Sequence, residues 1–221
     1  MKKIILSLVA VFAFGAVSAQ NLVSSKGEPY LPKQGDWSIG FNAGNALNFI
    51  GNAFNGNTGN SSANLFEGQK VISFGQGVFT STTLTFVGKK FDTDNTATRY
   101  TASFNFNFEK QKDVDGTTQF GLVAGYGKEW RKGTTRLQGF YGVDGLVGFA
   151  SPAKKQFGFG AQGFAGVEYF IFPKLALGAQ YTYGVGFEYA SDGNTEKNKM
   201  GFNIGNSNGL GVLSATVNAY F

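Results

Sequence analysis

Alternation of apolar and polar residues, repeated eight times along the chain, is the feature that most constrains its fold. In the clearest segment, 96–109, the run SFNFNFE places phenylalanine at every second position. A period of two matches a β-strand, because successive side chains of a strand point to opposite faces of the sheet. The eight segments cover 36–49, 78–90, 96–109, 119–130, 135–150, 157–171, 175–189 and 209–221. The sequence therefore predicts an all-β protein of eight strands.

The connections between these segments alternate in length. Short turns are expected at 91–95, 131–134 and 172–174, and longer loops at 50–77, 110–118, 151–156 and 190–208. This alternation puts the turns at one end of the molecule and the loops at the other. Together with an even number of alternating segments, it is typical of a transmembrane antiparallel up-and-down β-barrel. Such a sheet must close, because an unpaired strand edge cannot be satisfied in lipid.

Composition indicates which face of each strand points outward. The chain has 24 phenylalanines and 9 tyrosines, too many for the narrow lumen of an eight-stranded barrel. A soluble barrel would have to bury them there, so we expect the apolar face to meet lipid and the charged face to line the lumen. Charged residues make up 15% of the chain, below the roughly 25% of an average soluble domain. The mean hydropathy of −0.11 is then the average of two unlike faces.

Aromatic residues gather near the expected ends of the strands. Those near the turn end are Trp37, Trp130, Tyr169, Phe172 and Phe221, and those near the loop end are Phe49, Phe149, Phe157 and Tyr189. Tryptophan and tyrosine are enriched where a bilayer meets water. We therefore expect these residues to form two interfacial girdles around the barrel.

The first 35 residues precede the alternating pattern. Residues 1–19 combine Lys2 and Lys3, an apolar stretch and the small residues VSA, which together predict a cleaved secretory signal peptide. Its removal lowers the formal net charge from +5 to +3, too little to predict a nucleic-acid-binding surface. Residues 20–35 are polar and are expected to be a flexible periplasmic leader. The barrel domain is expected over 36–221, without a transmembrane helix.

Three stretches and the last strand resemble a known family. The stretches are LTFVGKKFDTDNTATRY (84–100), GYGKEWRKGTTRLQGFYGVDGLVGF (125–149) and GVEYFIFPKLALGAQYTYG (166–184), and Tyr220 with Phe221 resembles the C-terminal insertion signal of bacterial outer-membrane proteins. The chain resembles the small porin-like outer membrane protein β-barrel family, of the OmpX/OmpA/OmpW type and common in Bacteroidetes. The resemblance implies an outer-membrane location, periplasmic termini and recognition by the outer-membrane assembly machinery.

The charged residues of the polar face form the most informative group. We expect a network of ion pairs inside the barrel, made of Lys89, Arg99, Glu129, Arg136, Asp144 and Glu168. Buried charges must be paired, because leaving one unpaired costs several kcal/mol. The network predicts a lumen that is plugged and does not conduct. The alternative is a gated, narrow path for ions or small solutes.

Catalysis is not expected. The chain has no cysteine and no histidine, which excludes thiol chemistry and histidine-based triads and removes the usual ligands of structural zinc. Two carboxylate pairs remain formal candidates, Asp144 with Glu168 and Asp92 with Asp94. The first is better explained as part of the lumen network and the second as local turn capping. We predict no cofactor, no metal and no catalytic residue.

These observations predict a structural or interaction protein of the envelope. The expected partners are the lipid bilayer and lipopolysaccharide, the latter through Lys154 and Lys155. Loops 50–77 and 190–208 are expected outside the cell, where loops commonly carry recognition. We expect a monomer that serves envelope integrity or surface binding, with a porin-like channel as the alternative.

Overall fold

The computed structural model describes residues 22–42, 52–56, 84–109, 117–151, 155–191, 198–205 and 211–221. The predicted signal peptide and nearly all of the predicted loop 50–77 lie outside these residues, as does Phe49. The fold below is that of the described part of the chain.

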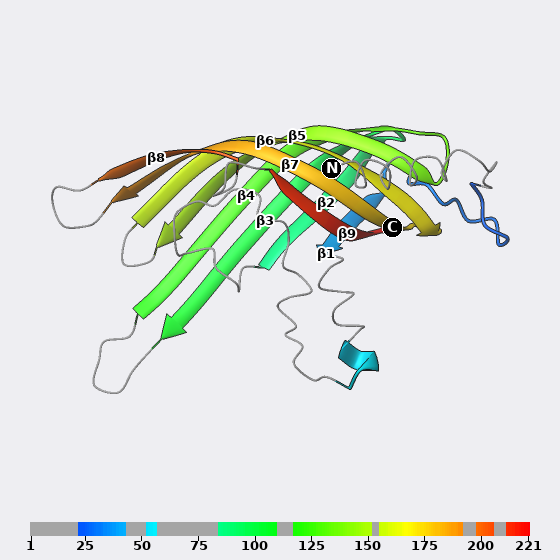
Figure 1. The fold of residues 1–221 in the computed structure, drawn as a ribbon. Helices are drawn as coiled ribbons and strands as arrows, with labels where there is room; N and C mark the ends of the chain where they lie inside the picture. Colours follow the sequence, from blue (N-terminus) through cyan, green and yellow to red (C-terminus); the bar gives the residue numbers. More distant parts are fainter. Residues whose placement is uncertain are drawn as a thin grey trace, which may run out of the picture.

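The described chain is all-β, as the alternation predicted. Its strands are β1 Trp37–Asn42, β2 Leu84–Thr93, β3 Thr96–Glu109, β4 Thr117–Lys132, β5 Leu137–Ser151, β6 Lys155–Phe172, β7 Leu175–Ser191, β8 Lys199–Ile204 and β9 Val212–Tyr220. Each strand from β1 to β7 pairs antiparallel with the next, and β9 pairs with both β7 and β1. The sheet therefore closes into a ring of eight positions, and Figure 1 shows its strands curving side by side.

The predicted loop 190–208 is wrong in part, because it contains a strand. β8 pairs with the last third of β7, from Val185 opposite Ile204 to Ala190 opposite Lys199, whereas β9 pairs with the beginning of β7. Figure 1 shows β8 and β9 at opposite ends of β7. The two strands occupy one position in the ring, so the last barrel strand begins ten residues earlier than the predicted 209 and is interrupted between them.

The three short connections lie at one end of the ring. The beginning of β1 and the end of β9, which pair with each other, lie at the same end. β2 and β3 are joined through Asp94 and Asn95, and β6 and β7 through Pro173 and Lys174. Lys174 adopts a φ of 60°, a backbone conformation found mostly in tight turns. The turn predicted at 131–134 is displaced, because β4 continues to Lys132 and the bend follows at 133–136. We call this end of the barrel the turn end.

Side-chain burial alternates along the strands as the sequence predicted. In β5, Phe140 and Leu146 are buried inside the ring, while Val143 and Val147 face outward. The same contrast holds in β4, where Tyr126 is 66% exposed and Glu129 is fully buried. Apolar side chains therefore cover the outside of the barrel, and its interior holds the charged and polar side chains together with some apolar ones such as Phe140 and Leu146.

Residues 22–35, which we call the N-terminal segment, pack against the turn end. Tyr30 and Leu31 lie against the buried apolar residues there, and the Gln34 amide donates a hydrogen bond of 2.8 Å to Asp94 Oδ1. The Gly35 amide donates to the carbonyl of Phe91. Residues 22–35 belong to the predicted flexible leader, and the structure gives them defined contacts with the barrel.

Two glycines make room for phenylalanine rings inside the barrel. A Cβ atom built on Gly142 would lie 2.3 Å from the ring of Phe164, and one on Gly166 would lie 2.4 Å from the ring of Phe140. Contacts this short force neighbouring atoms to move. Glycine at these positions lets two aromatic rings fill the lumen between β5 and β6.

We expect Gly142→Ala to lower the free energy of unfolding by about 1–3 kcal/mol, the usual cost of overpacking a filled interior. The matched control is Gly145→Ala on the same strand, whose added Cβ would meet its nearest atom, the Tyr126 carbonyl oxygen, at 3.8 Å. Urea titration of both variants in detergent micelles, followed by tryptophan fluorescence, measures the difference. Equal stability of the two variants would contradict this account of the packing.

Candidate functional site

A layer of buried charges crosses the interior near the turn end. Its six members come from five strands: Lys89 from β2, Arg99 from β3, Glu129 and Arg131 from β4, Asp144 from β5 and Glu168 from β6. All six side chains are at least 96% buried. Three cations face three carboxylates, so the layer is neutral as a set.

Glu168 binds the largest number of partners in this layer. Its carboxylate lies 3.1 Å from Lys89 Nζ and 2.5 Å from Arg131 Nη2. The hydroxyl of Tyr220 and the side-chain amide of Asn218 also donate hydrogen bonds to it, at 2.5 and 2.8 Å. Because β6, β4, β2 and β9 all reach this one carboxylate, it connects opposite parts of the barrel wall.

Glu129 is the second centre of the layer. It lies 2.7 Å from Arg99 Nη1, 3.1 Å from Lys89 Nζ and 3.2 Å from Arg131 Nη1. Lys89 and Arg131 therefore each bridge Glu129 and Glu168. Shared cations keep two carboxylates charged in one buried layer, where an isolated carboxylate would be costly.

Asp144 extends the layer toward the middle of the barrel. Its Oδ1 atom lies 3.3 Å from Arg99 Nε, and its Oδ2 atom accepts a hydrogen bond of 2.8 Å from Gln162. The guanidinium of Arg99 also lies 3.8 Å from the centroid of the Phe164 ring. Arg99 is thus held between two carboxylates and an aromatic face, which leaves it little freedom to move.

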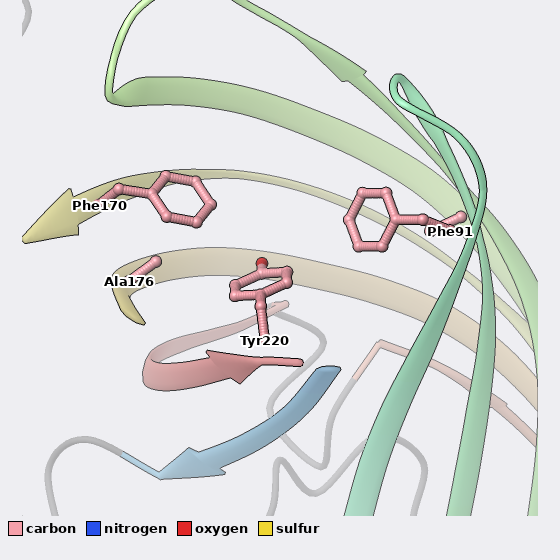
Figure 2. Packing of buried hydrophobic residues seen from close by; sticks show 5 residues of the cluster. Phe91, Phe170, Ala176 and Tyr220 are labelled. Carbon is pink, nitrogen blue, oxygen red and sulfur yellow. The ribbon is translucent and has the colours of Figure 1, made fainter. Parts of the chain in front are cut away.

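An apolar layer lies next to the charges at the turn end. Its residues are Phe91, Ala97, Phe170, Ala176 and Tyr220. Figure 2 shows the rings of Phe170 and Phe91 on either side of Tyr220. The Arg131 guanidinium lies within 6 Å of the ring centroids of Phe91, Phe170 and Tyr220. Arg131 and Tyr220 therefore join the apolar layer to the charged layer.

A cavity of about 260 Å³ lies between the N-terminal segment and the turns. Its apolar side is formed by residues such as Leu22, Val23 and Leu31, and its polar side includes Asp94 and Arg131. The cavity is partly open to solvent. It marks where the N-terminal segment covers, but does not completely fill, the turn end.

The structure places five of the six predicted network residues in the charged layer and one outside it. The residue outside the layer is Arg136. It lies in the bend after β4, with its guanidinium 3.6 Å from the centroid of the Tyr30 ring. Arg131, rather than the predicted Arg136, is the third cation of the charged layer. Arg131 follows Glu129 by two residues, a spacing that places both side chains on the same face of β4. This signal was missed because a turn was predicted to begin at residue 131.

The carboxylate pairs considered for catalysis do not form. Asp144 lies opposite Gln162, six residues along β6 from Glu168, or roughly 20 Å of extended strand. Asp92 instead accepts hydrogen bonds from Lys128 and Thr98. Asp94 accepts one from the N-terminal segment rather than from its own turn.

The residues predicted for the turn-end girdle lie at that end and face outward. They are Trp37, Trp130, Tyr169, Phe172 and Phe221, each exposed. Trp37 stacks on Tyr100 and Trp130 on Tyr141, with ring centroids 6.1 and 5.7 Å apart. Tyr220, which is predicted with Phe221 to form the insertion signal, points inward and is almost fully buried. Its side chain therefore lies inside the barrel.

Comparison with known proteins gives no family. No protein-family model matches the chain, and no curated protein matches it. Within the described residues, no helix has the length and apolar character needed to cross a membrane. The same residues contain no group of three or more acidic side chains placed to hold a metal ion.

Proposed function

We propose that this protein is an outer-membrane β-barrel with a plugged lumen and a structural or interaction role. The observation that carries the proposal is the inverted distribution of side chains. Phe106 and Tyr126 are about two-thirds exposed on the outside, whereas Glu129 and Glu168 have no exposed surface inside. A barrel in water would reverse this arrangement, but a barrel in lipid requires it.

The plug is supported by two successive layers across the interior. The apolar layer closes the turn end, and the neutral layer of charges lies directly behind it. The N-terminal segment adds Tyr30 and Leu31 from outside. A hydrated ion entering the lumen would have to displace paired charges and aromatic rings. We therefore propose that the barrel does not serve steady transport and carries no catalysis.

The sequence features together with this fold support the proposed location. The predicted signal peptide, the aromatic girdle and the resemblance to small porin-like outer-membrane barrels support a bacterial outer-membrane protein with its turn end in the periplasm. Lipopolysaccharide and the outer-membrane assembly machinery are the proposed partners. The loops opposite the turn end would face the outside of the cell, where they would bind a partner or support the envelope.

We expect the purified protein to insert into lipid vesicles and yet give little or no steady conductance in planar bilayers. Co-flotation with vesicles measures insertion, and single-channel recording measures conductance on the same preparation. Failure to float with vesicles would contradict the membrane assignment. A large, stable, single-step conductance would contradict the plugged lumen and support the channel alternative.

A further inference from the structure

A row of residues that includes two lysines crosses the outer face of the barrel at the turn-end girdle. The strand register places Trp37 opposite Lys90, Lys90 opposite Thr98, and Thr98 opposite Lys128. These four residues lie on four neighbouring strands and at one level of the barrel. Lys90 is exposed and Lys128 is partly exposed. Two cations therefore interrupt an outer face that is otherwise dominated by apolar and aromatic side chains.

The lysines are held by contacts on this same face. Lys90 Nζ lies 5.3 Å from the centroid of the Trp37 ring. Lys128 Nζ lies 2.7 Å from Asp92 Oδ2, which also accepts a hydrogen bond of 2.8 Å from the hydroxyl of Thr98. Asp92 balances one of the two lysines, so the group keeps a net charge of +1. Within the described residues Lys90 forms no ion pair with a carboxylate, and its side chain is exposed.

Aromatic rings border this group on the side of the barrel midplane. Trp37 stacks on Tyr100, and Tyr100 packs edge-on against Tyr126 with ring centroids 5.8 Å apart. All three rings are exposed, Tyr126 by two-thirds. Beyond them the outer face carries apolar residues such as Leu122 and Phe104. From the turn end toward the midplane, the outer face therefore carries cations, then aromatic rings, then apolar side chains. This order matches the phosphate, the glycerol and the acyl chains of a lipid.

We propose that Lys90 and Lys128, beside Trp37, form a binding site for the headgroup phosphate of an anionic phospholipid. Lys90 contacts the phosphate directly, and Lys128 adds charge from its position beside Asp92. Tyr100 and Tyr126 lie along the glycerol and the first part of the acyl chains. The net charge favours an anionic headgroup over a zwitterionic one. This site rests on the proposed membrane location, but its lipid preference goes beyond that location.

The two tryptophans of the chain allow a direct test. In a Trp130→Phe background, Trp37 is the single tryptophan and lies beside Lys90. Quenching of Trp37 fluorescence is measured in mixed vesicles in which either phosphatidylglycerol or phosphatidylcholine carries brominated chains. We expect half-maximal quenching at a fraction of brominated phosphatidylglycerol about fivefold lower than that of brominated phosphatidylcholine. This is the preference that one net basic charge provides at a membrane surface. The preference should fall as salt is raised.

The variant Lys90→Gln with Lys128→Gln should abolish the preference without preventing insertion. The matched control is Lys26→Gln with Lys33→Gln, which removes the same charge from exposed positions of the N-terminal segment and should keep the preference. Inorganic phosphate at millimolar concentration should not compete. Equal quenching by both lipids in the parent protein, or loss of the preference in the control, would overturn the site. If no brominated lipid quenches Trp37, the membrane proposal itself fails.

Discussion

Glu168→Ala should lower the free energy of unfolding of the barrel by about 3–5 kcal/mol, the usual cost of removing one partner of a buried ion pair. The substitution would leave Lys89 and Arg131 with Glu129 as their shared carboxylate and would remove the acceptor of Tyr220 and Asn218. Urea unfolding of the folded protein in micelles or vesicles, followed by tryptophan fluorescence, measures the loss.

Two further variants make this result specific. Glu168→Gln retains an oxygen acceptor but removes the charge, so its effect separates the ionic contribution from the hydrogen bonds. Glu28→Ala removes a carboxylate from an exposed position of the N-terminal segment and should leave stability unchanged. If the Glu168→Ala and Glu28→Ala variants had the same free energy of unfolding, the charged layer would not stabilise the barrel.

Arg131→Ala should also cost about 3–5 kcal/mol, whereas Arg136→Ala should cost about 1 kcal/mol or less. Arg131 pairs with two of the three buried carboxylates of the layer, Glu129 and Glu168, so its removal leaves their charge undercompensated. Arg136 makes a partly exposed contact with Tyr30. The two arginines lie five positions apart, which makes each a control for the other under identical urea titration.

The outcome distinguishes two assignments of the interior. If Arg136→Ala proved the more damaging substitution, β4 would have to end at the position predicted from the sequence, and the bend would have to lie at 131–134. The register between β4 and β5, with Lys132 opposite Gly139, would then be incorrect. A measurement of stability thus tests the position of a turn.

The faces of the strands could be predicted because their signal is local and repeated. Residues such as Phe104 and Glu129 follow a strict period of two, so the sequence alone assigns each to the outside or the inside. The ring of eight positions followed from the number of such segments and the unequal connections. The register of β5 and β6 kept this alternation over their full length.

The errors occurred where the period alone does not define the end of a strand. RKGT resembles a turn, but Arg131 continues β4 because the buried Glu129 and Glu168 are its counter-ions. Those partners lie up to 37 residues away and cannot be identified from the local sequence. β8 was missed because its surroundings are rich in asparagine and glycine. Tyr30 was assigned to a leader because its packing partners, Phe91, Ala97 and Tyr220 among them, lie far along the chain.

The seam between β1 and β9 has a consequence for the order in which the molecule assembles. Tyr220 lies on β9, whose pairing with β1 closes the ring, and its hydroxyl reaches Glu168 on β6. Closure of the ring and completion of the charged layer are therefore one event that joins distant parts of the chain. Until β9 docks, Glu168 lacks two of its donors and the interior stays open to water. An unfinished barrel is thus distinguished from a finished one by hydrated charges as well as by a free sheet edge.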